Sequence, residues 1–171
     1  MGIRMIDLEK YKCVCLDSSP FIYFIDEDPK YSAFVEQIFK QISDGVSPAV
    51  SSYLTLLEVL VKPIKERMPD IAAQYRNFML NSHSLTLYPL DQRVAETAAG
   101  LRAKYDRVGI KIKTPDAIQV ATGLINGADV FVTSAGLFKS RCEDEDCPYA
   151  AESKKSAALI EAKWDDGEFS W

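Results

Sequence analysis

The amino-acid sequence predicts one α/β domain with three layers, in which a central parallel sheet is flanked by helices on both faces. Short apolar runs alternate with helical patterns along most of the chain. These runs lack a polar face, which is typical of parallel strands buried on both sides. The length of 171 residues and the hydrophobic content of 47% fit one globular domain. Repeated strand and helix alternation therefore favours a covered parallel sheet.

The first strand is expected at residues 11–17, an apolar run that ends in an aspartate. Residues 20–29 contain two prolines and two aspartates, so we interpret them as turns. The helical pattern that follows covers residues 31–43. The chain thus begins with a strand, a turn region and a helix.

A second strand and helix follow. Residues 46–50 form a brief apolar run, and Ser51 or Ser52 can cap a helix that runs toward Val61. Pro63 is expected to stop this helix, because proline lacks the N–H that the helix interior needs.

The next pair is a helix and then a strand. Pro69 and an aspartate open a helix that extends to about residue 81. Residues 84–90 alternate and are rich in Leu, Thr and Tyr, which predicts a third strand. Asp91 then caps a helix that reaches about residue 106.

The clearest helix signal is the segment Thr114-Pro115-Asp116. It places a capping hydroxyl, a proline and a first-turn acid in the order that helix N-termini prefer. The predicted helix covers residues 117–126, and Gly127 ends it.

Residues 128–133 are predicted to form the last buried strand. We therefore expect the three-layer α/β domain to cover residues 1–141. Residues 142–171 are expected to form a C-terminal appendage. Within it, an acidic loop at residues 142–146 precedes a predicted helix at residues 153–163.

Charge and composition limit the classes of function. The net charge of −5 and the pI near 5.0 argue against a broad basic face for nucleic acid. They allow an acidic site at which bound cations reverse the local charge. No apolar leader or membrane-length run is present, and the four cysteines do not form a secreted disulfide pattern. We expect a cytoplasmic protein without a membrane segment.

Acidic residues fall where a parallel sheet collects its ligands, beyond the carboxyl ends of the strands. Asp17 ends the first strand, Glu58 lies on the helix after the second, and Asp116 lies in the helix before the last. Close carboxylates raise one another's pKa unless cations lie between them. Oxygen ligands without His or Cys favour Mg²⁺ or Mn²⁺.

Each acid also has a structural explanation. Asp17 could simply end a strand, and Asp116 could stabilise the N-terminal end of a helix. Glu58 is harder to explain in this way, because its neighbours are leucines and valine and an unpaired buried acid is costly.

Four ordered motifs resemble the PIN domain family. They are VCLDSSPFI at residues 14–22, LEVL at 57–60, TPDAIQVA at 114–121 and GADVFVTS at 127–134. The resemblance covers roughly residues 12–139, and the ordered set is what makes it specific. The fourth family motif has an acid two residues after its threonine, where this chain has Ala135.

The resemblance implies a Mg²⁺- or Mn²⁺-dependent endoribonuclease of the VapC toxin type, acting on RNA as a homodimer and silenced by a cognate antitoxin. Asp17 and Asp116 would then hold the metal ion, with Glu58 as a direct or water-mediated ligand that helps to activate water. In supporting roles, Ser19 would hold Asp17, and the hydroxyls of Thr133 and Ser134 would lie near the scissile phosphate.

Ala135 leaves three explanations open: an engineered inactivation, a natural pseudo-nuclease, or an enzyme that recruits another acid such as Asp129, Glu143 or Asp144. It also separates two classes of function. One is a ribonuclease whose parent form has an acid at this position. The other is a non-catalytic PIN scaffold that binds RNA or a protein. A nucleotide-binding domain is disfavoured, because no glycine-rich loop follows the first strand.

Overall fold

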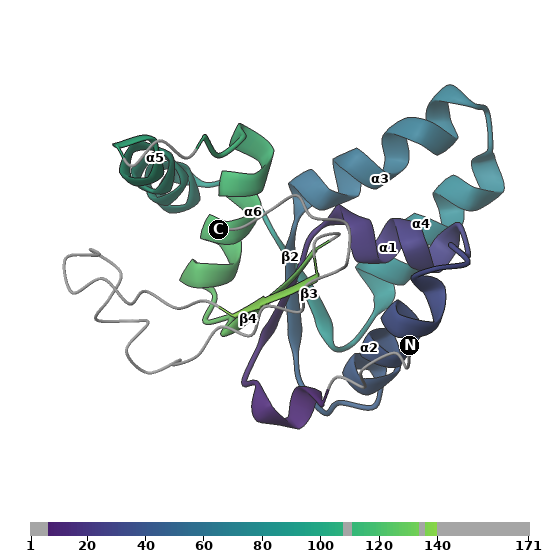
Figure 1. Ribbon diagram of the computed structural model, residues 1–171. Helices are drawn as coiled ribbons and strands as arrows, with labels where there is room; N and C mark the ends of the chain where they lie inside the picture. Colours follow the sequence, from purple (N-terminus) through teal and green to yellow (C-terminus); the bar gives the residue numbers. More distant parts are fainter. Residues whose placement is uncertain (1–6, 108–110, 134–135, 140–171) are drawn as a thin grey trace.

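The computed structural model describes residues 7–107, 111–133 and 136–139 (Figure 1). Within these ranges one sheet has the strand order β3-β2-β1-β4-β5. Strands β1 to β4 pair in parallel, and β5 pairs with β4 in antiparallel orientation. The strands are β1 (Val14–Leu16), β2 (Ala49–Ser52), β3 (Leu85–Tyr88), β4 (Val130–Thr133) and β5 (Gly136–Lys139).

Helices connect the parallel strands, and the three-layer α/β class predicted from the sequence is confirmed. The helices are the 3-10 helix η1 (Leu8–Lys10), α1 (Ser18–Ile25), α2 (Ser32–Ser43), α3 (Tyr53–Lys65), α4 (Pro69–Asn81), α5 (Gln92–Arg107) and α6 (Thr114–Ile125). Along the chain, α1 and α2 connect β1 to β2, α3 and α4 connect β2 to β3, and α5 and α6 connect β3 to β4.

Helix α1 corrects the expectation of turns after the first strand. Asp17 is its N-cap, and the Asp17 carboxylate accepts the backbone N–H of Ser19 at 2.8 Å. Pro20 lies in the first turn, where a helix needs no N–H donor from it. Pro20 therefore belongs to a helix. The expected turn is confined to the residues after Ile25, where Asp26, Asp28 and Pro29 lie.

Three smaller expectations were also wrong. Helix α3 contains Pro63 and ends two residues beyond it, at Lys65. The N-cap of α6 is Lys113, and Thr114 is the first residue inside the helix. Strand β5 was not predicted, and it gives the parallel sheet an antiparallel edge. The predicted helical caps Ser52 and Asp91 are confirmed, since their side chains accept N–H groups of their helices.

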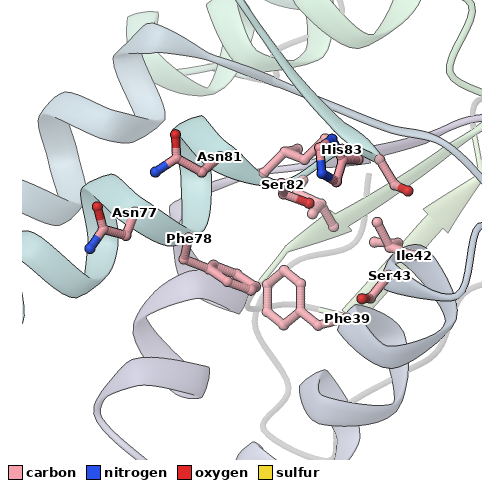
Figure 2. Close-up of a pocket in the computed structure, with 11 residues that line it drawn as sticks. Phe39, Ile42, Ser43, Asn77, Phe78, Asn81, Ser82 and His83 are labelled. Atoms are coloured by element: carbon pink, nitrogen blue, oxygen red, sulfur yellow. The ribbon is translucent and has the colours of Figure 1, made fainter.

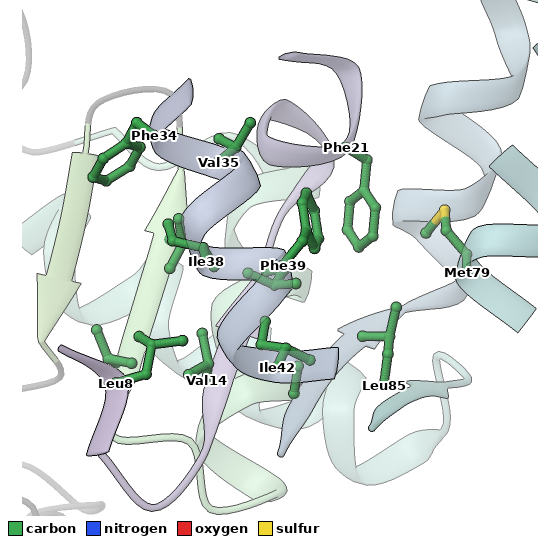
Figure 3. Packing of buried hydrophobic residues seen from close by; sticks show 14 of the residues in the cluster. Leu8, Val14, Phe21, Phe34, Val35, Ile38, Phe39, Ile42, Met79 and Leu85 are labelled. Atoms are coloured by element: carbon green, nitrogen blue, oxygen red, sulfur yellow. The ribbon is translucent and has the colours of Figure 1, made fainter. Parts of the chain in front are cut away.

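One face of the sheet carries the main hydrophobic core (Figure 3). Val14 and Leu16 of β1 point into it, and helices α1, α2 and α4 cover it. Phe21 of α1 is fully buried, with its ring centroid 5.3 Å from that of Phe39 and 6.0 Å from that of Phe78. These aromatic contacts fix α1, and with it the segment directly after Asp17.

The opposite face is covered by α5 and α6 (Figure 1). Cys15 of β1 points to this side, as the strand period of two requires. At Gly123 of α6, an added Cβ would lie 2.8 Å from both Cβ and Sγ of Cys15. Glycine at this position therefore lets α6 approach β1 closely.

The strand order reverses between β1 and β4, because β2 and β3 lie on one side of β1 and β4 lies on the other. Ligand sites of open α/β sheets collect at the carboxyl ends of the strands at such a reversal. Leu16 pairs with Val132 there, and the backbone N–H of Asp17 donates to the Val132 carbonyl at 3.2 Å.

The proposed boundary between domain and appendage lies at residue 141, and the appendage at residues 142–171 is outside the described residues. Among the helices in the described ranges, none has the length and apolar character that crossing a lipid bilayer requires.

Gly123→Ala is expected to lower the free energy of unfolding by up to about 2 kcal/mol. The new methyl group overlaps Cys15, and this cost exceeds the gain of about 1 kcal/mol that alanine gives a helix. Urea denaturation measures the change.

Gly100→Ala provides the matched control, because Gly100 is exposed in α5. It is expected to stabilise the chain by up to about 1 kcal/mol. Equal effects of the two substitutions would show that the close contact between α6 and β1 is unimportant for stability.

Candidate active site

Asp17 lies at the carboxyl end of β1 and is partly buried. Its carboxylate accepts the Ser19 N–H at 2.8 Å and hydrogen bonds from the hydroxyls of Thr133 and Ser19. The pKa of Asp17 is nevertheless raised to about 7, chiefly by burial and to a smaller extent by the charge of Glu58, and the hydrogen bonds offset only part of this rise. Ser19 thus contacts Asp17, and Thr133, for which a place near the scissile phosphate was expected, also forms a hydrogen bond with Asp17.

Glu58 lies on α3 and is also partly buried. The Gln119 side-chain amide donates to its Oε2 atom at 2.7 Å, and the Ser18 side chain forms a second hydrogen bond with the carboxylate. Burial raises the pKa of Glu58 above its usual value. The two hydrogen bonds lower this pKa, and the charge of Asp116 raises it.

Asp116 lies in the first turn of α6 and is exposed. Its negative charge acts on Glu58, and that of Glu58 acts on Asp17. The three acids, which are far apart in the sequence, therefore form a series in which each carboxylate is affected by the charge of the next. The series runs from Asp17 at the end of β1, through Glu58, to Asp116 at the exposed start of α6.

In the described part of the chain, no Lys or Arg forms an ion pair with an acid of this series. The ion pairs found there involve lysines that bind Asp7, Asp26 and Asp44, all outside the site. Within the described residues, no Lys or Arg charge is among the main influences on the pKa of Asp17 or Glu58. A divalent ion would supply the missing positive charge.

The donor set fits magnesium or manganese better than a soft metal, because every coupled group is a carboxylate. Among the described residues, no three His, Cys, Asp or Glu side chains are already gathered into a ligand set. Magnesium commonly keeps several waters and uses only one or two protein carboxylates. Asp17 and Glu58, with Asp116 farther out, suit such a hydrated ion.

Two predicted positions of the fourth motif, Ser134 and Ala135, lie outside the described residues, as do Glu143 and Asp144. Asp129 can be assigned. Its carboxylate accepts the backbone N–H groups of Lys12 and Cys13, at 3.0 and 3.2 Å. It therefore lies where β1 begins, at the opposite end of the strand from Asp17, and does not substitute for the missing acid.

Sequence reasoning missed Ser18 and Gln119, the two side chains that hold Glu58. A signal for Gln119 was available, since it follows Asp116 by three positions and so lies on the same face of α6. Ser18 was hidden by the failure to predict α1.

A cavity of about 320 Å³ lies elsewhere, between α2, α4 and the start of β3 (Figure 2). Phe39 and Phe78 form an apolar part of its wall, and Asn81 and His83 contribute polar groups. No acidic residue lines it, so this cavity is separate from the coupled acids.

Comparison with known proteins decides the family. The model of the PIN domain family matches residues 14–139, which include all three acids. This chain belongs to the PIN domain family. Members of the family are generally nucleases that depend on divalent metal ions.

A solved structure supports the PIN fold. The chain is similar to a chain in the crystal structure of VapBC2 from Rickettsia felis bound to a DNA fragment from its promoter. The TM-score is 0.55 at 15% sequence identity, over 71% of this chain and 86% of that one. At this identity the likeness establishes the PIN fold alone. No curated protein shows significant sequence similarity to the chain.

Asp17→Asn is expected to stabilise the PIN domain at about pH 8, and to change its stability little at about pH 4, when divalent ions are absent. The folded pKa of about 7 exceeds the roughly 3.9 of an unfolded aspartate. The folded state therefore retains a proton that the unfolded state loses, and stability falls as the pH rises between these values. Asparagine removes a cost on the order of 2–4 kcal/mol and keeps a capping oxygen. Urea denaturation in EDTA measures the difference.

Asp129→Asn is the control, because Asp129 forms two backbone hydrogen bonds away from the site. It is expected to bring no stabilisation at either pH. An Asp17→Asn effect that is the same at both pH values would contradict the raised pKa.

Proposed function

We propose that this PIN domain is a metal-dependent endoribonuclease of the toxin type, which hydrolyses RNA phosphodiester bonds. Asp17, Glu58 and Asp116 are its proposed catalytic and metal-binding residues, and Mg²⁺ or Mn²⁺ is the proposed ion. The observation that supports this most is the series of coupled acids at the reversal of strand order, with which no Lys or Arg among the described residues forms an ion pair. A site of this kind gains most from a divalent cation.

A bound ion would polarise the scissile phosphate and lower the pKa of a water molecule. Asp17 would be the innermost ligand, with its orientation fixed by Ser19 and Thr133. Glu58 has a raised pKa, which suits a group that accepts the proton of the attacking water. The hydroxyl of Ser134 is proposed to face the phosphate, because that of Thr133 donates to Asp17.

Asp116 would complete the site from the exposed side. Its place in the first turn of α6 leaves room for a long substrate to approach. Lys111 and Lys113 are exposed just before this turn, and we propose that they contact RNA phosphates. Two lysines near the site would attract RNA even though the whole chain is acidic.

The proposed partners follow from the toxin type. The similar structure from Rickettsia felis is titled as VapBC2 bound to promoter DNA. By this likeness, we propose that a small cognate antitoxin binds and silences the chain. From the motif resemblance and the sequence, we also propose that the chain forms a homodimer and acts in the cytoplasm.

A second candidate function rests on Ala135, which stands where the family motif has an acid. Without that carboxylate, fewer oxygens are available to hold an ion or its waters, so metal affinity and rate should both fall. The alternative is a PIN scaffold that binds RNA or a protein partner without cleavage.

Ala135→Asp is expected to raise the rate of cleavage of a single-stranded RNA pool by at least roughly ten-fold over the parent chain. The added carboxylate supplies the missing oxygens of the fourth motif. Cleavage of fluorescent RNA with Mn²⁺ or Mg²⁺ measures the rate, and EDTA should abolish it.

Ala135→Asn is the matched control, since it adds a side chain of the same shape without the charge. It is expected to stay near the parent rate. Asp17→Asn introduced together with Ala135→Asp should remove the gained activity. If no protein of the series cuts any RNA in a broad pool, the binding scaffold becomes the better account.

A further inference from the structure

Gln119 occupies a position that is unusually well fixed for a long polar side chain. It is only 4% exposed, in the second turn of α6. Its backbone carbonyl accepts the Cys15 Sγ–H at 3.6 Å, and Gly123 one turn later packs directly on Cys15. The helix that carries Gln119 is therefore anchored to β1 at Gln119 itself and again one turn later.

The side chain of Gln119 points from α6 to the proposed metal ligand on α3. Its Nε2 atom donates to Oε2 of Glu58 at 2.7 Å, a short bond for an amide and a carboxylate. Glu58 could otherwise rotate about its side-chain torsions. The bond holds Oε2 toward α6, and the Ser18 side chain of α1 forms a second hydrogen bond with the same carboxylate.

We propose that Gln119 sets ion selectivity by making Glu58 a one-oxygen ligand, so that the site favours Mg²⁺ over Ca²⁺. This inference rests on the proposed metal site. Magnesium requires near-octahedral geometry and accepts single carboxylate oxygens with water. Calcium takes more oxygens at longer distances and commonly uses both oxygens of one carboxylate. An amide N–H on Oε2 competes with binding of an ion through both carboxylate oxygens. It leaves binding through one oxygen available.

The neutrality of Gln119 is part of this role. A lysine or arginine in the same place would also hold the Glu58 carboxylate, but its charge would repel a divalent cation. An amide fixes the orientation and leaves the full negative charge of Glu58 for the ion. Gln119 is therefore a positioning residue, which acts on the ion through Glu58.

Gln119→Met tests this role, because methionine is similar in length and lacks the N–H. Displacement of bound Mn²⁺ by Mg²⁺ and by Ca²⁺, followed by electron paramagnetic resonance on the full chain, gives both affinities. We expect the preference for Mg²⁺ over Ca²⁺ to fall by roughly ten-fold. Gln119→Asn, whose amide is one methylene too short to reach Glu58, should shift the ratio in the same direction and covers the case in which the methionine variant does not fold.

Gln92→Met is the matched control. Gln92 donates to Glu96 at 2.8 Å on the exposed face of α5, an equivalent bond outside the site. Gln92→Met should leave the ratio of the Mg²⁺ and Ca²⁺ affinities unchanged. If the parent chain binds the ions and neither Gln119 variant changes the ratio, Gln119 has no role in selectivity and the proposed metal site stands. If the parent chain binds neither Mn²⁺ nor Mg²⁺, the metal site itself is wrong, and this inference is overturned with it.

Discussion

The carboxylate of Asp17 is the group on which the arrangement of this PIN domain depends. Asp17 directly follows β1 and is the N-cap of α1. Its carboxylate accepts hydrogen bonds from the Ser19 N–H and from the Thr133 hydroxyl of the neighbouring strand β4. These contacts join two strands and a helix at the reversal of strand order. They do not cancel the cost of removing the charge from water, because the pKa of Asp17 still rises to about 7.

The rest of the fold holds this unfavourable charge in place. On one side, Phe21 anchors α1 among the aromatic rings of α2 and α4. On the other side, the contact between Gly123 and Cys15 sets α6 against β1. Glu58 is then held between Ser18 and Gln119, on two different helices. The site is thus assembled by packing on both faces of the sheet, and its repulsion between acids is what a bound cation would relieve.

The sequence predicted the layers because apolar runs and helix caps are local signals. It indicated Asp17 and Asp116 because one follows a strand and the other begins a helix, and Glu58 because an unpaired acid among apolar neighbours is costly. It failed at α1, where proline and polar residues are compatible with a first helical turn as well as with a loop. It also missed the bond between Gln119 and Glu58. These residues are 61 positions apart, and only the packing of α6 beside α3 brings them together.

Paramagnetic broadening tests the central claim most directly, namely that the three coupled acids form one site for a divalent ion. Substoichiometric Mn²⁺ would be added to the isotope-labelled chain, and the loss of amide signals in NMR spectra would be mapped. The account predicts that signals around Asp17, Glu58 and Asp116 broaden first and together, and that Mg²⁺ restores them. Broadening that begins in the acidic segment at residues 143–146, or that spares Glu58, would contradict it.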